Sequence, residues 1–296
     1  MHSATDDSAP AIGIIGGTGL YRFFSDDDAV LETEVDTPFG PPSAPLRVAT
    51  VDERRLVFLP RHGAHHEYLP HRIPYRANLW ALRALGVRRV IGACAVGGLR
   101  PDQGPGTIVV PDQLIDRTTQ RAQTFFDRPE IWAGATRPDG PVHVQFADPY
   151  CPGLRESLSS ASADVIDGGT MVVIEGPRFS TRAESRWYAT EGASLINMTG
   201  QPEAALAREL KMCYSAACLV TDLDAGIEAG MGVTAAEVFA EFARSLPRLV
   251  DVIRAAIESI DAGAECDCGA AEHDVDSLFA TGLGTTLGAR PTAGAR

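Results

Sequence analysis

Two aspartates two residues apart are the clearest chemical feature of the sequence. Asp222 and Asp224 follow a strongly apolar run, 213–220, which is typical of a buried strand. Because side chains at i and i+2 of an extended chain lie on the same side, both carboxylates are expected to face one pocket. Two close carboxylates disfavour double ionisation, which raises one pKa and keeps a proton available near neutral pH. The pair is therefore suited to protonating a leaving group, although an isolated D-x-D is more often a solvated loop or a helix N-cap.

A glycine-rich turn, Gly16-Gly17-Thr18-Gly19, follows another apolar run at 11–17. Its backbone N–H groups and the Thr18 hydroxyl can hold an anion. It is not a dinucleotide-binding fingerprint, because G-x-G-x-x-G read from Gly17 needs glycine at position 22, which is arginine. The only lysine, Lys211, is too far away for a Walker A loop, so the turn argues against both a dehydrogenase and an ATP-binding protein.

Arg61 and His62 follow a strand expected over 55–59, and an arginine at the carboxyl end of a strand is well placed for bidentate contact with phosphate. Three more histidines follow, at positions 65, 66 and 71. Metal sites usually add carboxylates or thiolates at defined spacings, as in H-E-x-x-H, which is absent here. We therefore expect no metal, one phosphate-facing histidine, and the other histidines in structural positions or near an oligomer interface.

Alternating strand and helix patterns position these residues. Apolar runs predict strands at 11–17, 46–51, 55–59, 88–91, 107–110, 171–174, 194–196 and 213–220. Helical spacing predicts helices at 75–85, 181–190, 201–210 and 234–262. This alternation favours a single α/β domain with a mainly parallel central sheet and helices on both faces.

The domain is predicted to span 11–262, with a flexible N-terminal tail at 1–10 and a poorly ordered C-terminal extension at 263–296. Within that extension, Cys266 and Cys268 are compatible with a strained disulfide, with a metal site that includes His273, or with two free thiols. The remaining four cysteines, at positions 94, 151, 213 and 218, lie in apolar stretches and are predicted to be small core residues or site linings.

The composition is acidic: 39 Asp and Glu against 26 Lys and Arg give a formal net charge of −13 over 296 residues. Such a chain is a poor candidate for binding nucleic acid or an anionic membrane. No apolar run approaches the ~20 residues that span a bilayer, and the N-terminus lacks signal-peptide features, so we expect a cytoplasmic protein. The acidic, lysine-poor composition favours a halophilic source, with an ordinary acidic protein from a GC-rich genome as the alternative.

Taken together, the motifs resemble the methylthioadenosine phosphorylase branch of the trimeric purine nucleoside phosphorylases. The matching stretches are GIIGGTGLY (13–21), TPFGPPSAPL (37–46), LPRHGAHH (59–66), YRANLWAL (75–82), GGLRPDQGPGTIVVPDQLIDRTT (97–119), EGPRFSTRAES (175–185), INMTGQPEAALARE (196–209) and TDLDAG (221–226). The resemblance implies a three-layer α/β/α sandwich with a mixed central sheet, of the nucleoside phosphorylase/hydrolase type. It also implies a homotrimer or a hexamer built from two trimers, and no metal or organic cofactor.

The resemblance implies a phosphate site at four matching positions, Thr18, Arg61, His62 and Thr199. Family members also use a threonine hydroxyl and the backbone N–H that follows it, and these positions are Cys94 and Ala95 here. Because a thiol is a weak donor, both residues are expected in the binding loop without a firm contact from the Cys94 side chain.

The same resemblance places Met198 against the ribose and base, with Asp222 and Asp224 at the purine. Asp222 is the expected proton donor. Ser180 and Ala235 match positions that tune specificity in the family, and the small Ala235 leaves room for a 5′-methylthio group.

The implied reaction is phosphorolysis of 5′-methylthioadenosine, with inorganic phosphate as co-substrate. A 6-amino group donates hydrogen bonds and needs a carboxylate acceptor, so the two aspartates favour a 6-aminopurine. The alternative within the family is a 6-oxopurine nucleoside phosphorylase acting on inosine, guanosine or methylthioinosine. A third possibility is a nucleoside-binding protein without activity, for which the cysteine at position 94 is the only hint.

Overall fold

The computed structural model of the chain describes residues 10–17, 20, 23–25, 28–128, 141–224, 234–269, 274–280 and 287–291. The strands are β1 (Ala11–Gly16), β2 (Leu31–Val35), β3 (Leu46–Val51), β4 (Arg54–Pro60), β5 (Val87–Gly98), β6 (Ile108–Val110), β7 (Gln113–Arg117), β8 (Val165–Asp167), β9 (Thr170–Ile174), β10 (Ala193–Asn197), β11 (Cys213–Asp222) and β12 (Leu287–Pro291). The helices are α1 (Tyr75–Ala84), α2 (Pro152–Ser160), α3 (Arg182–Thr190), α4 (Gly200–Glu209), α5 (Ala235–Ser259) and α6 (Asp276–Ala280), with 3₁₀ turns η2 (Pro70–Arg72) and η5 (Asp267–Gly269).

The strands form one mixed sheet in the order β12-β2-β3-β4-β1-β5-β10-β9-β7, with β11 paired to β5 and β6, and β8 paired to β6. The long strand β5 joins the two parts of the sheet. It runs parallel to β1 and β11, whereas its last residues, Gly97 and Gly98, pair antiparallel with β10. The carboxyl ends of β1, β4 and β11 therefore meet at one edge beside β5.

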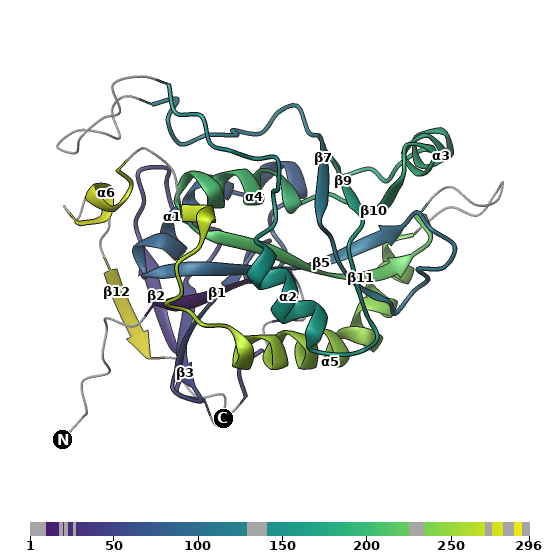
Figure 1. Cartoon of the computed structure of the whole chain (residues 1–296). Coiled ribbons are helices and arrows are strands. Elements are labelled where there is room, and N and C mark those ends of the chain that lie inside the picture. The colour runs from purple at the N-terminus through teal and green to yellow at the C-terminus, as the bar shows by residue number, and fades with distance from the viewer. Residues whose placement is uncertain are drawn as a thin grey trace.

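Helices cover both faces of the sheet (Figure 1). On one face, α1 and α4 contribute Trp80 and Leu206 to an apolar cluster. On the other, α2 and α5 contribute Leu154 and Ile253 to a second cluster. This arrangement confirms the expected three-layer α/β/α architecture, and none of the described helices is both long and apolar enough to cross a membrane.

The structure also contains elements that the sequence patterns did not predict, namely β2, β7, β8 and α2 among others. Strand β2 reads LETEV, and three of its five residues are exposed. The limits predicted for the domain, 11–262, and for its two tails stay a prediction. Within 263–296, the described parts include η5, α6 and β12, the last of which pairs antiparallel with β2.

Glu209, the last residue of α4, gives the fold a pH-dependent element. Its carboxylate is 6% exposed and accepts a hydrogen bond from the Phe125 backbone N–H at 2.8 Å. Burial raises the pKa of Glu209 from 4.5 to about 7. The folded chain therefore holds an extra proton between these two values, and its stability falls as the pH rises through that window.

We expect Glu209→Gln to flatten this pH dependence, because the amide oxygen still accepts the Phe125 hydrogen bond but does not ionise. Relative to the wild type, the variant should gain up to about 3 kcal/mol as the pH rises from 4.5 to 7. Thermal unfolding across this range measures the effect, with Glu156→Gln on exposed surface of α2 as the control. Parallel pH profiles for the wild type and Glu209→Gln would contradict the assignment.

Candidate active site

A cavity of about 190 Å³ opens at the carboxyl ends of β4, β10 and β11, next to β5 and the start of α5. Its polar lining includes Arg61, His62, Ser180, Asn197, Thr199, Asp222 and Asp224. Six of these seven residues were predicted site residues, the exception being Asn197. The fold therefore brings together groups that are far apart in the chain, from Arg61 to Asp224.

Both aspartates of the D-x-D pair line the cavity. Asp222 ends β11, and its carboxylate accepts hydrogen bonds from the Thr221 hydroxyl and from the Asp224 backbone N–H, each at 2.8 Å. Asp224 has a φ of +48°, a left-handed conformation that aspartate tolerates, and its carboxylate accepts a hydrogen bond from the Ser185 hydroxyl. A tight turn after the strand thus places the second carboxylate beside the first.

Burial raises the pKa of Asp222 above its ordinary value, and the neighbouring Asp224 carboxylate adds to the shift. The hydrogen bonds from Thr221 and from the Asp224 N–H oppose it. The direction of this shift favours retention of a proton on Asp222, whose role as the proton donor stays a prediction.

The approach of the aspartates to β5 depends on Gly97. A Cβ atom on Gly97 would lie 3.1 Å from the Asp222 Oδ1 and 3.2 Å from the Asp224 Cβ. It would also lie 2.9 Å from the Ile196 side chain, closer than real Cβ atoms come. Glycine at this position therefore lets the two carboxylates pack against the strand.

Arg61 leaves the end of β4 and is 2% exposed. It forms a two-pronged ion pair with Glu203, with Nε–Oε1 and Nη2–Oε2 distances of 2.6 and 3.0 Å, and donates to the Ala93 carbonyl at 2.8 Å. Burial alone would lower the pKa of Arg61, but Glu203 more than offsets this and keeps the guanidinium charged. The Tyr214 hydroxyl donates to the same carboxylate at 2.9 Å.

Glu203 was not among the predicted site residues. The signal that could have identified it is a carboxylate within the otherwise apolar stretch PEAALA, on a helix predicted at 201–210. A charged group buried among apolar neighbours needs a partner, and Arg61 is that partner.

His62 presents a neutral ring to the cavity. Its Nδ1 lies 2.8 Å from the Tyr68 carbonyl oxygen, which only accepts, so Nδ1 carries the proton and Nε2 is a bare acceptor. Burial lowers the pKa of His62 to about 4, and the charge of Arg61 contributes. The ring stacks on His66 with centroids 4.5 Å apart, and His66 also lines the cavity.

The two predicted binding-loop residues on β5 face different surroundings. Ala95 lines the cavity, whereas Cys94 is buried beside Arg61, whose Nη2 donates to its sulfur at 3.7 Å. A hydrogen bond from Cys218, together with Arg61, lowers the pKa of Cys94 to about 7 against the opposing effect of burial. The place of Cys94 and Ala95 in a phosphate-binding loop stays a prediction, with no firm contact expected from the Cys94 thiol.

Among the remaining predicted residues, Met198, Thr199 and Ser180 line the cavity. Ala235 is exposed at the start of α5, and the residues of that helix that line the cavity are Val238, Phe239 and Phe242. Thr18 lies outside the described residues, so its predicted role is unchanged. The aromatic and apolar wall from α5 was not predicted.

Two polar atoms in the cavity wall lack protein partners among the described residues. The Ser180 hydroxyl and the Asn197 Nδ2 are buried without a hydrogen bond, although the Asn197 Oδ1 accepts from the Thr199 and Gly200 N–H groups. Buried polar groups are nearly always paired, so these two atoms are available to a water or to a polar ligand.

Comparison with known proteins shows the family to which the chain belongs. Residues 11–258 match the profile of the Phosphorylase superfamily. The chain is 58% identical over 255 residues to the S-methyl-5′-thioadenosine phosphorylase of Mycolicibacterium smegmatis, covering 86% of this chain and 93% of the relative. It is also 54% identical over 275 residues to the purine nucleoside phosphorylase of Streptomyces coelicolor, covering 90% and 95%.

Among solved structures, the methylthioadenosine phosphorylase from Schistosoma mansoni in complex with adenine is similar, with a TM-score of 0.78 and 31% identity over 92% of this chain and 96% of that chain. The fold, the motifs and these relatives agree with the resemblance read from the sequence. The chain therefore belongs to the phosphorylase superfamily, among relatives named methylthioadenosine phosphorylase and purine nucleoside phosphorylase.

Proposed function

We propose that the protein catalyses reversible phosphorolysis of 5′-methylthioadenosine to adenine and 5-methylthioribose 1-phosphate, a pentosyltransferase reaction. The observation that carries the proposal is the placement of Asp222 and Asp224 in one cavity with Arg61. The cavity thus combines acceptors for a base, a retained proton and a cation for an anionic co-substrate. The names of the relatives at 58% and 56% identity support the same substrate.

The aspartate pair sets the base preference. The 6-amino group of adenine donates hydrogen bonds, and the two carboxylates supply acceptors for it. A mismatched buried polar pair costs roughly 1–3 kcal/mol, or about tenfold to a hundredfold in discrimination. The solved Schistosoma enzyme was crystallised with adenine, which supports a 6-aminopurine as the base.

Asp222 also serves as the proton donor. Breaking the C–N bond leaves negative charge on the purine, and protonated Asp222, or a water that it orients, transfers a proton to N7. The raised pKa of Asp222 keeps that proton available closer to neutral pH. Above this raised pKa the donor is lost, so the rate is expected to fall with rising pH.

Phosphate binds beneath C1′, away from the two aspartates. It is held by Arg61, Thr199 and the Ala95 N–H, with Thr18 as a further donor. The neutral His62 ring offers Nε2 as an acceptor, which suits the P–OH group of hydrogen phosphate. The anion stabilises the oxocarbenium-like transition state and then adds to C1′. The reaction is thus balanced without a metal or organic cofactor, and phosphate is consumed as a substrate.

The wall formed by Val238, Phe239 and Phe242 favours an apolar 5′ substituent such as methylthio. Ser180, which lines the cavity, remains a proposed specificity position. Ala235 is exposed and outside the lining, so its proposed role rests on the resemblance alone. Met198 is proposed to lie against the ribose and base, where its thioether packs well on a flat ring.

A second candidate is a 6-oxopurine nucleoside phosphorylase acting on inosine, guanosine or methylthioinosine. The observation that favours it is the 54% identity to a relative named purine nucleoside phosphorylase. A protonated aspartate can also donate a hydrogen bond to a 6-oxo group, so the aspartate pair is compatible with a 6-oxopurine as well as with a 6-aminopurine.

Incubating the protein with methylthioadenosine, adenosine and inosine, each with and without phosphate, separates these candidates. We expect phosphate-dependent base release with the highest kcat/KM for methylthioadenosine. Base release from inosine but not from methylthioadenosine would replace the proposal by the second candidate, and no release from any of them would favour a binding protein.

We also propose a cytoplasmic homotrimer, or a hexamer of two trimers. The assembly rests on the resemblance to the trimeric family, and the location stays an expectation from the sequence.

A further inference from the structure

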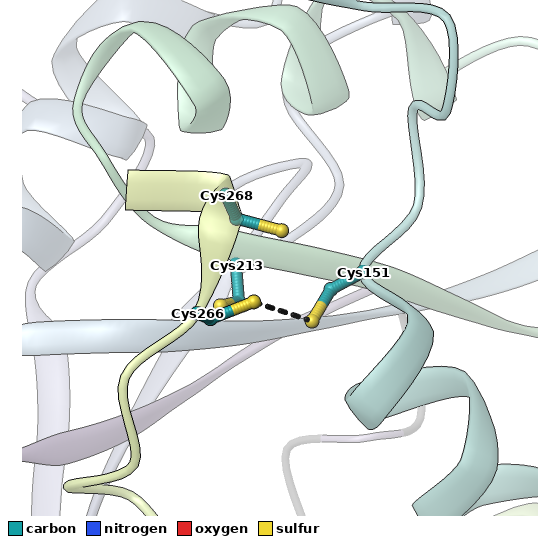
Figure 2. A group of neighbouring side chains, drawn as sticks. All are labelled: Cys151, Cys213, Cys266 and Cys268. Atoms are coloured by element: carbon teal, nitrogen blue, oxygen red, sulfur yellow. Dashed lines mark hydrogen bonds between the residues drawn. The ribbon is translucent and has the colours of Figure 1, made fainter. Parts of the chain in front are cut away.

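Four cysteines from three distant parts of the chain converge at one point (Figure 2). Cys151 directly precedes α2, Cys213 opens β11, and Cys266 and Cys268 lie in the segment after α5. Their sulfur atoms all lie within 4.8 Å of one another. Three of the four residues are buried and Cys266 is half-buried, so the cluster is closed to most of the solvent.

We propose that Cys151, Cys213, Cys266 and Cys268 bind a structural zinc ion. With Zn–S bonds of about 2.3 Å, the sulfurs of a regular ZnS₄ tetrahedron lie about 3.8 Å apart. The Cys151 and Cys266 sulfurs are 3.7 Å apart, which matches this spacing and exceeds the ~2.05 Å of a disulfide. Four thiolates with no open position are the ligand set of a structural zinc site. On binding, four thiols lose their protons and the site has a net charge of −2.

A buried cation beside the cluster is the second observation. Arg89 on β5 is 6% exposed, and none of the described ion pairs involves it. Its Nη1 donates to the Cys213 sulfur at 3.4 Å and its Nη2 to the Ala264 carbonyl at 2.6 Å, while its Nε is buried without a partner. A buried guanidinium needs a nearby anion, and a zinc tetrathiolate supplies the negative charge that Arg89 otherwise lacks.

The position of the cluster indicates a structural role. Cys213 begins β11 and Asp222 ends it, so the cluster lies roughly 30 Å from the catalytic aspartate along the strand. The metal would fasten the chain after α5 to the start of β11, a strand inside the sheet that pairs with both β5 and β6. The sequence predicted no metal, and allowed one at Cys266 and Cys268 only together with His273. The proposal replaces that expectation with Cys151 and Cys213 as the partners, and His273 lies outside the described residues.

Metal content of the full chain tests the proposal directly. The protein is expressed with added zinc, lysed under reducing conditions, desalted in the presence of EDTA, and analysed by mass spectrometry for metals. We expect about one zinc per chain and, in the denatured unreduced protein, a mass with all six cysteines as thiols. After replacement of zinc by cobalt(II), the absorption bands of tetrahedral cobalt–thiolate coordination should appear.

The double variant Cys266→Ser/Cys268→Ser should lose the zinc and melt at a lower temperature. Cys218→Ala, on the same strand as Cys213 but outside the cluster, is the matched control and should retain about one zinc. Folded wild-type protein without zinc, or a mass lowered by the hydrogens lost in disulfides between these cysteines, would overturn the proposal. That result is independent of whether the double variant folds.

Discussion

Arg61→Ala is expected to raise the KM for phosphate about 100-fold, because a charge-assisted hydrogen bond contributes about 1.5–3 kcal/mol. The KM for the nucleoside should change much less, since the base is proposed to bind at Asp222 and Asp224 and not at Arg61. Steady-state kinetics with each substrate varied in turn separates the two constants. A defect confined to the nucleoside would remove Arg61 from the anion site.

The variant needs a control for folding, because Glu203 would be left as a buried, unpaired carboxylate at a cost of about 3–5 kcal/mol. The double variant Arg61→Ala/Glu203→Gln removes that charge. We expect it to recover much of the lost stability while the KM for phosphate stays high. Recovery of phosphate affinity together with stability would mean that Arg61 acts only by holding the fold.

Asp222→Asn is expected to lower kcat for methylthioadenosine about 1,000-fold, within the range that a positioned general acid contributes. The amide cannot donate a proton to N7, but its N–H group can donate a hydrogen bond to a 6-oxo group. The ratio of kcat/KM for inosine over methylthioadenosine should therefore rise about tenfold or more. Unchanged relative rates would refute the role of hydrogen-bond polarity in base choice.

Although Asp222→Asn should lower kcat, it is expected to raise the stability of the fold. Because burial raises the pKa of Asp222, the folded chain binds this proton more tightly than the unfolded chain, and stability falls as the pH rises through the window between the two values. The neutral amide of the variant has no such penalty, so Asp222→Asn should melt higher than the wild type at neutral pH. Asp251→Asn, on an exposed position of α5, is the control and should change neither property.

Local sequence patterns predicted most of the elements that build the site. The apolar run at 213–220 lies in β11. The strand expected at 55–59 corresponds to β4, which ends at Pro60, directly before Arg61. Strands such as β2 and β7 were missed because most of their residues are exposed, so they lack the apolar signature of the buried strands. A half-exposed strand is specified by its pairing partner, which lies elsewhere in the chain.

Pairwise relations over long distances were the part that the sequence could not provide. Glu203 meets Arg61 across 142 positions, and no local pattern links them. The same holds for Cys151 and Cys266, which are 115 positions apart. From their local sequence, Cys151 was predicted to be a small core residue or a site lining, and Cys266 was predicted to lie in the C-terminal extension. Both contacts exist only once the chain has folded, so the spacing of these residues along the sequence does not predict them.

The central claim is that phosphate itself attacks C1′ of the nucleoside in this cavity. Phosphorus NMR of a reaction with methylthioadenosine and inorganic phosphate tests it most directly. We predict loss of the inorganic phosphate signal, a new sugar 1-phosphate signal, and free adenine in equal amount. Release of adenine with free methylthioribose and no loss of inorganic phosphate would contradict the claim, because water and not phosphate would then be the nucleophile.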